Sequence, residues 1–561
     1  MGRESPKETN GENGRAAKRL RVETEDVESV FRESLLVDST RSDLAGKFRT
    51  SKPYLHCVID HLCEDGLLRK VRDEIMSALH FTEKETDIYK VHQTGDLANM
   101  DGLPKEELAQ LSSLFKLRNA LYSSEFRKFI GDVTGCGHLS GSKTDMSINT
   151  YLNGCHLLNH DDVIGSRRVS YILYLPDPDE YWDPAYGGAL ELYPVLTKGT
   201  PAVNPSVSIP PKWNQFVMFT VQPGHSFHSV EEVVVDKARL SISGWFHIPQ
   251  EGEPGYLETP ENGEAPSSLE QLQAGASAPF TPFSETVDPE ELEGLSEEDI
   301  VTLGRWINPR YLDIRVLEQV SERFLEHSSL QLVDFLHKDL VEQIKRATER
   351  ADEECGLLSP KLPKHGTGEH GSWKVAGPPH KFRYAMLDAA HTPKGSDDAT
   401  STLFAELVKE MFPSPAFRRW LALVTQLIPQ SYRGIARRFR PGLDYTLAWS
   451  SPTQLLDATL CFATRKKTED AAAWESDELG GYECHMAPHE GDEDPAVYRQ
   501  MDEDGALLTV SAGWNVLTLV MRDEGLMKFI KYISARAPGS RWDVAFEYEL
   551  PDQEDEGDKS S

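Results

Sequence analysis

The sequence predicts a mostly β protein of the α+β class, with two antiparallel barrels or sandwiches in tandem and helices packed on each. Three observations predict this class. The chain has 561 residues, too many for one core of ordinary size. Helical periodicity gives way to short alternating runs twice along the chain. Residue patterns of the first half also return, in the same order, in the second half.

Composition divides the chain into five segments. Residues 1–27 are polar without periodicity, so we expect a disordered basic arm. Folded domains are expected over 28–250 and 296–550. The stretch 251–295 between them, rich in Pro, Gly, Ser and Glu, is typical of an acidic linker. Acidic residues dominate 551–561, which should be a solvated tail.

The first domain is expected to begin with helices and continue with strands. Apolar residues recur at helical spacing over 64–81 and again over 104–130, where Pro104 suits a first helical turn. After Gly141 the period shortens to two, which predicts strands. The strand-like runs are "SINTYL", "RVSYILYL", "ALELYP", "NQFVMFT" and "ARLSISGWFHI".

The second domain repeats this order. A helical pattern is again expected over 296–351, and a further region of helices followed by strands runs from about 402 to 550. Four ordered pairs of residues anchor the repeat, and the slow drift in their spacing is what loop insertions produce. The pairs are Gly154 with Gly442, Gly187-Gly188 with Gly480-Gly481, Trp213-Asn214 with Trp514-Asn515, and Arg239 with Arg541.

A candidate metal site begins at the sequence His160-Asp161-Asp162. In an extended edge, residues two apart point to the same side, so His160 and Asp162 could share an ion while Asp161 points away. With His228 they would form the two-histidine, one-carboxylate set of non-haem Fe(II) oxygenases. His225 is the alternative third ligand. We favour His228 because "SFHSV" is typical of strand entry, whereas His225 follows a Pro-Gly turn.

Arg239 lies eleven residues after His228, in a run that alternates. Alternation would aim Arg239, Ser241 and Ser243 into the barrel. A guanidinium there needs a carboxylate partner, and its forked geometry suits the distal end of a dicarboxylate. Tyr174 could add a hydroxyl to the same carboxylate, and Tyr151 could do likewise from the preceding strand.

The second domain keeps the scaffold residues but lacks the metal set, so we expect it to be structural or a docking surface. His485 and His489 are expected to be a solvated loop pair without a third ligand. By the glycine spacing, His160 is matched by Ala448, Asp162 by Ser450, and His228 by Phe529 or Ile530.

Charge and cysteine content exclude other functions. The net charge of −32 argues against a nucleic-acid-binding surface and is compatible with a basic polypeptide partner. No run of apolar residues is long enough to predict a membrane span. Seven cysteines without a C-x-x-C pair favour a reducing compartment. Arg15 and the run 18–21 form either a nuclear import signal or a few solvated charges on a loose tail.

The motifs "HDDVIGSRRVSYILYL", "GGALELY", "WNQFVMF", "SFHSV" and "RLSISGWFH" closely resemble the eukaryotic 2-oxoglutarate- and iron-dependent oxygenases that hydroxylate a proline of a small-subunit ribosomal protein at the decoding centre. The resemblance covers about residues 50–550. It implies tandem double-stranded β-helix (jelly-roll) domains, catalytic over 28–250 and degenerate over 296–550. Fungal members are also described as termination-and-polyadenylation proteins and as regulators of a sterol-responsive transcription factor.

The resemblance also implies roles and partners. The expected activity is prolyl 3-hydroxylation or 3,4-dihydroxylation, with effects on translation termination, in nucleus and cytoplasm. Expected partners beyond the ribosomal protein are termination factors, the poly(A) machinery or a transcription factor. The expected cofactors are Fe(II), 2-oxoglutarate and ascorbate. The implied iron ligands are His160, Asp162 and His228, and the implied 2-oxoglutarate residues are Arg239, Tyr174 and Tyr151.

Two other functions remain open at this point. One is an oxygen-sensing binding protein that controls the stability of a transcription factor through its C-terminal domain. The other is an oxygenase acting on nucleic acid or a small molecule, which the acidic charge disfavours.

Overall fold

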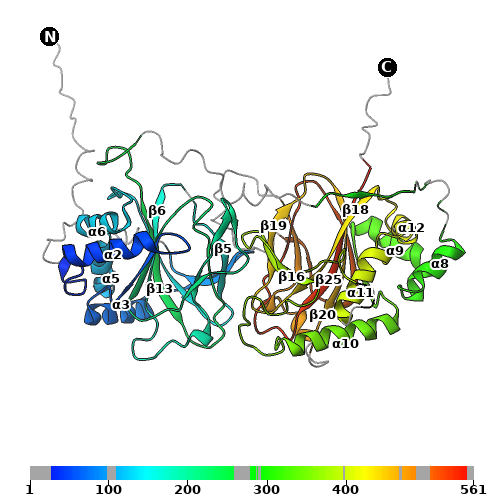
Figure 1. The fold of residues 1–561 in the computed structure, drawn as a ribbon, viewed down its shortest axis with the longest axis horizontal. Coiled ribbons are helices and arrows are strands. Elements are labelled where there is room, and N and C mark those ends of the chain that lie inside the picture. The colour runs from blue at the N-terminus through cyan, green and yellow to red at the C-terminus, as the bar shows by residue number, and fades with distance from the viewer. Residues whose placement is uncertain are drawn as a thin grey trace, which may run out of the picture.

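The computed structural model contains two β barrels side by side, with helices gathered on the outer side of each (Figure 1). The structure describes residues 27–95, 97, 109–163, 165–257, 278–285, 287, 292, 294–393, 395, 398–465, 471–487 and 506–551. The basic cluster of the N-terminal arm, the middle of the expected linker and almost all of the expected acidic tail lie outside these residues. Within them, no helix has both the length and the apolar character needed to cross a membrane.

The first barrel is one curled antiparallel sheet. Its strands follow the order β1-β11-β6-β13-β4-β3-β5-β12-β7-β10, with β2 paired to β3. The strands are β1 (His56–Asp60), β2 (Thr82–Glu85), β3 (Tyr89–Gln93), β4 (Thr144–Tyr151), β5 (His156–His160), β6 (Arg167–Tyr174), β7 (Leu190–Leu192), β10 (Val207–Ile209), β11 (Gln215–Thr220), β12 (His228–Val230) and β13 (Arg239–His247), beside the small ribbon β8 (Val195–Thr197) and β9 (Thr200–Pro201).

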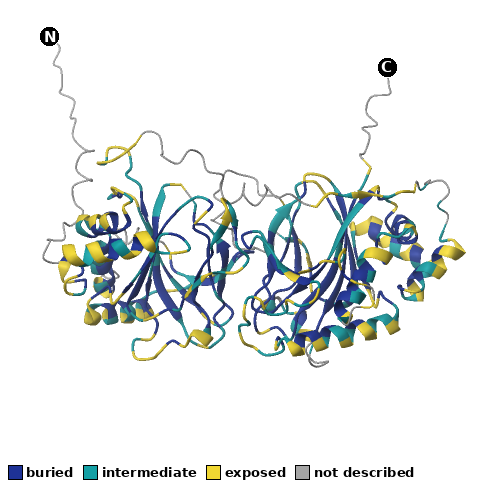
Figure 2. Ribbon diagram, viewed as in Figure 1, coloured by how far each residue is buried: buried dark blue, intermediate teal, exposed yellow. Residues whose placement is uncertain are grey.

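Helices cover one face of this sheet and leave the other face for a site. They are α2 (Asp38–Thr50), α3 (Asp65–Ala78), α5 (Ser112–Leu121) and α6 (Ser124–Thr134), and the short turn η2 spans Pro184–Tyr186. Leu240 and Ile242 of β13 are buried against the helices, whereas Arg239, Ser241 and Ser243 line a cavity inside the barrel. The alternation predicted for this strand is therefore observed. Figure 2 shows the strands of the barrel mostly dark blue, whereas the helices at its outer side also carry yellow, exposed residues.

The single helix predicted over 104–130 is wrong in one respect. Its described part forms two helices, because α5 ends at Leu121 and α6 begins at Ser124. The Ser123 hydroxyl accepts a hydrogen bond from the Phe126 amide, so it caps a new helix rather than continuing the old one. Pro104 lies outside the described residues.

The second barrel repeats the first strand for strand, in the order β15-β23-β20-β25-β18-β17-β19-β24-β21-β22. Its strands are β15 (Ser329–Val333), β16 (Trp373–Ala376), β17 (Phe382–Leu387), β18 (Ser431–Phe439), β19 (Tyr445–Ser450), β20 (Leu455–Ala463), β21 (Glu483–Met486), β22 (Ala506–Val510), β23 (Trp514–Arg522), β24 (Met527–Ile530) and β25 (Arg541–Glu549). Its helices are α8 (Glu297–Leu303), η4 (Pro309–Leu312), α9 (Ile314–His327), α10 (Lys338–Glu354), α11 (Ala399–Glu406), η5 (Leu407–Met411), α12 (Pro415–Thr425), α13 (Ala471–Trp474) and η7 (Asp477–Leu479). Part of the expected linker, β14 (Thr281–Pro282), pairs with β18.

The repeated residues hold equivalent turns. Asn214 and Asn515 adopt left-handed φ values of 58° and 57°. The side-chain oxygen of each accepts a backbone N–H, from Cys63 and from Leu336, at 2.9 Å in both cases. These shared contacts support the tandem repeat, and the predicted mostly β fold class is confirmed.

The two barrels contact each other through buried groups. The carboxylate of Glu232 accepts hydrogen bonds from the Ala535 amide at 2.7 Å and the Tyr532 hydroxyl at 3.2 Å. Lys531, 2% exposed, pairs with Glu85 at 3.0 Å. Buried charges that cross an interface need such partners, so the barrels are fixed against one another.

Candidate metal centre and cosubstrate pocket

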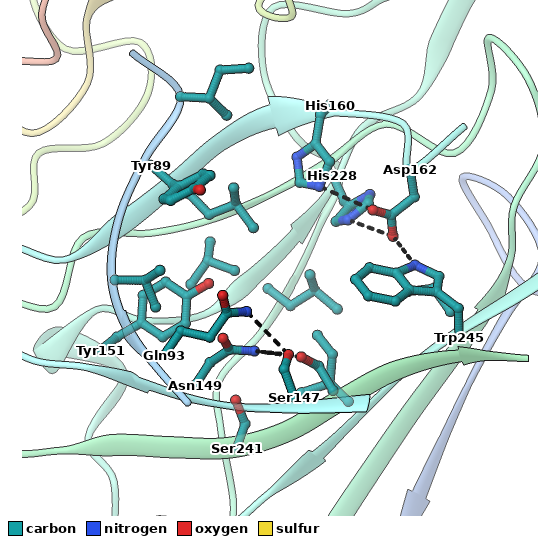
Figure 3. Close-up of a pocket in the computed structure, with 18 of the residues that line it drawn as sticks. Tyr89, Gln93, Ser147, Asn149, Tyr151, His160, Asp162, His228, Ser241 and Trp245 are labelled. Atoms are coloured by element: carbon teal, nitrogen blue, oxygen red, sulfur yellow. Dashed lines mark hydrogen bonds and ion pairs between the residues drawn. The ribbon is translucent and has the colours of Figure 1, made fainter. Parts of the chain in front are cut away.

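Two histidines meet across neighbouring strands of the first barrel. His160 ends β5 and His228 begins β12, and the antiparallel pairing places them opposite one another. Their ring centroids lie 4.2 Å apart. Both imidazoles point to the same place inside the barrel (Figure 3).

Asp162 completes the group, but not through strand alternation. It lies beyond the end of β5 with a left-handed φ of 61°, so a turn rather than an extended edge carries its side chain back. One carboxylate oxygen is 3.4 Å from His160 Nε2 and the other is 3.5 Å from His228 Nε2. One ligand atom from each residue fits within 4.8 Å of the others, so the three can hold one metal ion.

The backbone fixes the tautomer of each histidine. The Nδ1 of His160 lies 2.9 Å from the Leu158 carbonyl, and the Nδ1 of His228 lies 2.8 Å from the Ser226 carbonyl. Because a carbonyl oxygen only accepts, each Nδ1 must carry the proton. Both Nε2 atoms are therefore left as ligands, as metal-binding histidines require.

Electrostatics keep the carboxylate charged. Burial alone would raise the pKa of Asp162, but His228, His160 and Arg167 outweigh burial and hold this pKa well below its usual range. Burial, and then the neighbouring His160, lowers the pKa of His228 to about 4. Asp162 is thus an anion and His228 a neutral imidazole near pH 7. Burial lowers the pKa of His160, but the Asp162 carboxylate outweighs burial and raises it, so a divalent cation would displace a proton from His160.

Asp161 and His225 lie apart from this group. Asp161 is buried and accepts a hydrogen bond from the Gly224 amide at 3.1 Å, while its carbonyl accepts one from Ser226 at 2.9 Å. It therefore fixes the loop that leads to His228. His225 is exposed to solvent, so of the two alternatives only His228 reaches the candidate metal site.

Two residues beside the group were missed in the sequence. The indole N–H of Trp245 donates to Asp162 at 3.1 Å. Arg167 stacks on that indole at 3.6 Å and lies 4.0 Å from the same carboxylate. The alternation of β13, which turns Arg239 inward, would have placed Trp245 on the same face.

Arg239 lies in the same cavity as the metal group and is 1% exposed. Its Nε donates to the Gly188 carbonyl at 2.6 Å and another guanidinium nitrogen to the Tyr174 hydroxyl at 3.3 Å. Tyr151 instead lies with its ring 4.6 Å from the guanidinium carbon, a cation–π contact. Gly188 permits this packing, since a Cβ there would lie 2.9 Å from the arginine Cδ.

No described carboxylate pairs with Arg239. Its counterpart Arg541 donates to the Gly481 carbonyl in the same way, but it also pairs with Asp543 at 3.2 Å. A buried guanidinium without an anion is costly. The first barrel thus presents a ready site for an external carboxylate, which suits 2-oxoglutarate.

The cavity between the metal group and Arg239 has a volume of about 400 Å³. A polar network on its floor was not foreseen from the sequence. Asn149 donates to Ser243 at 2.6 Å and to Ser147 at 3.3 Å, and Gln93 donates to Ser147 at 3.2 Å (Figure 3). His380 and Leu447 of the second barrel also line this cavity, so both barrels shape it.

The second barrel places a lysine at the corresponding point. The pairing that sets His228 opposite His160 sets Lys528 opposite Trp449. Lys528 forms ion pairs at 3.1 Å with Asp457 and with Glu483. The ammonium group of Lys528 therefore lies between carboxylates at the position where the first barrel has its candidate metal ligands.

Four expectations for the second barrel are corrected here. Trp449, rather than Ala448, matches His160, so the position matching Asp162 moves from Ser450 to the next residue. Lys528, rather than Phe529 or Ile530, matches His228. The histidine His485 is not a solvated loop residue, because it is 1% exposed on β21 and contacts Glu483 at 3.0 Å; its predicted companion His489 lies outside the described residues.

A second group with metal-ligand geometry lies between the barrels. Glu191, Glu231 and His365 bring one ligand atom each within 4.8 Å. Glu191 already accepts hydrogen bonds from His365 at 2.6 Å and Ser229 at 2.9 Å. We interpret this group as an interface network because protein donors occupy both carboxylate oxygens of Glu191.

Comparison with known proteins agrees with this geometry. Residues 146–247 match the 2OG-Fe(II) oxygenase superfamily, and residues 298–557 match the family described as oxoglutarate and iron-dependent oxygenase degradation C-term. The chain is 37% identical over 502 residues to prolyl 3,4-dihydroxylase OGFOD1 of Ostreococcus tauri, covering 88% of this chain and 95% of that protein.

Two vertebrate relatives extend the comparison. Prolyl 3-hydroxylase OGFOD1 of Mus musculus is 33% identical over 344 residues, 61% of this chain and 51% of that protein. The Xenopus laevis protein of the same name is 29% identical over 523 residues, 89% and 88% of the two chains. These matches confirm the resemblance drawn from the motifs: the chain belongs to the OGFOD1 family of 2-oxoglutarate- and Fe(II)-dependent oxygenases.

Proposed function

We propose that this chain hydroxylates a prolyl residue of a small-subunit ribosomal protein, with His160, Asp162 and His228 as the Fe(II) ligands. One observation carries the proposal: these three side chains converge in the cavity that also holds a buried guanidinium without a described anion. The names of the relatives support a prolyl residue as the target. The ribosomal substrate rests on the motif resemblance.

Each residue of the cavity has a distinct role in this proposal. Arg239, oriented by Tyr174 and Gly188, binds the distal carboxylate of 2-oxoglutarate, and Tyr151 packs against the guanidinium. Bound iron and 2-oxoglutarate would supply the oxidation of an unactivated C–H bond by O2, with succinate and CO2 as coproducts. Ascorbate would keep the iron reduced.

Charge supports a basic protein substrate. The chain carries a net charge of −32, which attracts basic polypeptides and repels nucleic acid. Ribosomal proteins are basic because they neutralise RNA phosphates, so a ribosomal segment fits this surface better than an oligonucleotide does.

Intact-mass measurement tests the proposal. The small-subunit protein from cells that contain the gene should carry the mass of one or two added oxygen atoms on a proline, and the mass should disappear when Asp162→Ala replaces the wild type. An unchanged mass in the Asp162→Ala cells would overturn the assignment.

A second candidate function is favoured by the family matched over residues 298–557, whose description names degradation. In that role the second barrel would bind a transcription factor and control its stability. The test is the half-life of that factor in cells expressing the Asp162→Ala variant. If the Asp162→Ala variant gives the factor the half-life that it has in wild-type cells, the binding role is supported. If the half-life equals that in cells lacking the gene, the binding role is excluded.

A further inference from the structure

Two buried side chains on the wall of the cavity have polar atoms without a hydrogen-bond partner among the described residues. Asn159 of the first barrel is 1% exposed, and no described residue hydrogen-bonds to its amide nitrogen or amide oxygen. His380 of the second barrel is 6% exposed, and its Nδ1 likewise has no partner within the described part of the chain. Both residues line the cavity that contains the metal group.

Asn159 sits in a bulge beside a metal-binding residue. Between Leu157 and His160, two residues of β5 face a single residue of β12, so β5 carries one extra residue. Bulges of this kind redirect a side chain and are frequent next to active sites. The second barrel has the same bulge, between Thr446 and Trp449. There the position of Asn159 is taken by Ala448, so only the barrel with the metal group carries the amide.

His380 approaches the same region from the second barrel. Its ring lies 5.0 Å from that of Phe227, the residue before His228. The Tyr445 hydroxyl donates to the Pro379 carbonyl at 2.6 Å, which fixes the loop that carries His380. Burial, and then Lys381, lowers the pKa of His380 to about 3, so the ring is a neutral imidazole.

Leaving buried donors and acceptors unpaired costs folding stability, and native proteins rarely do so. An amide and a neutral imidazole offer donors and acceptors without charge. They match a peptide group, which presents one N–H and one carbonyl, better than they match a charged side chain. A prolyl residue has no backbone N–H, so these contacts must go to the carbonyl groups and to the neighbouring residues of the substrate.

We propose that Asn159 and His380, one from each barrel, form a subsite that binds the peptide backbone of the substrate next to the target proline. The subsite rests on the proposed function for its ligand, a protein chain. It makes the second barrel part of the substrate site rather than a separate module. Both residues are positioning residues.

The test uses the full chain with Asn159→Leu, His380→Phe and the double variant. Each change keeps the volume close to that of the original residue and removes the polar atoms. The probes are proline-containing segments of small-subunit ribosomal proteins together with an unrelated set of proline-containing peptides. His391→Phe, at a solvent-exposed histidine, is the matched control.

Each single change should raise the KM for the best peptide, and its anaerobic Kd, about fivefold, as expected for one lost hydrogen bond. The double variant should raise both more than tenfold. The KM for 2-oxoglutarate should stay within twofold of wild type, and the control His391→Phe should leave the peptide KM and the peptide Kd unchanged. The Tm should be unchanged or higher, because an unpaired buried polar group has been removed.

Two results would overturn the subsite. One is a double variant whose peptide KM and Kd stay within twofold of wild type. The other is a lower Tm with unchanged peptide binding, which means that the two groups hold buried water. The proposed substrate is tested separately by the wild type: if it modifies only unrelated peptides, the ribosomal assignment fails, and the subsite is still measured on the peptide that it modifies best.

Discussion

The indole N–H of Trp245 donates a hydrogen bond to the Asp162 carboxylate over 3.1 Å. Trp245 lies on β13, the strand that begins with Arg239. A single strand therefore positions both the carboxylate of the candidate metal centre and the anchor for 2-oxoglutarate.

Trp245→Phe should weaken Fe(II) binding about tenfold to a hundredfold, the usual effect of removing a group that orients a metal ligand. Anaerobic titration with Fe(II) measures the change. Trp213→Phe is the control, because Trp213 donates to Asp65 at 2.7 Å in an equivalent indole–carboxylate bond outside the cavity. Equal Fe(II) affinity in wild type and Trp245→Phe would show that this hydrogen bond has no role in metal binding.

Arg239→Lys should raise the KM for 2-oxoglutarate at least tenfold, because an ammonium cannot bind a carboxylate through two parallel hydrogen bonds. Steady-state kinetics with varied 2-oxoglutarate measure the effect. Arg541→Lys changes the counterpart in the second barrel and should leave this KM unaltered while lowering the Tm. An unchanged KM in Arg239→Lys would place the cosubstrate elsewhere.

Lys528→Met should lower the free energy of unfolding by about 3 kcal/mol, since it leaves Asp457 and Glu483 with one buried cation fewer. Urea unfolding followed by circular dichroism checks this value. The exposed Lys338→Met is the control and should change stability by less than about 0.5 kcal/mol. Prolyl hydroxylation should persist in both variants, because Lys528 belongs to the second barrel.

Glu231 should make the contact between the barrels sensitive to pH. Burial, and then the Glu191 carboxylate, raises the pKa of Glu231 to about 8 from 4.5. A raised carboxyl pKa means that the folded state binds the proton more tightly, so this contribution to stability is present below pH 4.5 and is lost as the pH rises through 8.

Glu231→Gln mimics the protonated acid and should match the wild type below pH 4.5. Its stability relative to wild type should then grow as the pH rises to 8, which unfolding curves at several pH values measure. Glu326→Gln, at an exposed position, should show no such trend. A constant difference between Glu231→Gln and wild type over this range would contradict the raised pKa.

The fold class could be predicted because it depends on the conformational requirements of individual residues. Gly154, Gly442, Asn214 and Asn515 all adopt positive φ, a demand that restricts the residue type and therefore leaves a visible repeat in the sequence. The break at Ser123 was not foreseen, because helical periodicity continues across it. The metal candidates could be found because few residue types bind iron.

Two kinds of feature could not be predicted from the sequence: those that depend on strand register and those that depend on contact between the barrels. The left-handed turn at Asp162 is set by the loop around it, so alternation placed the right residue near the site for the wrong reason. Lys528 was missed because the glycine spacing does not fix the register of β24. Asn159 and His380 are more than two hundred positions apart, and only the packing of one barrel on the other brings them to one cavity.

Metal content tests the central claim most directly. After anaerobic incubation with Fe(II) and removal of free metal, the wild-type chain should retain about one iron, and Asp162→Ala should retain less than a tenth of that amount. Lys528→Met should match the wild type. Full iron retention by Asp162→Ala, or two irons per wild-type chain, would contradict a single metal centre in the first barrel.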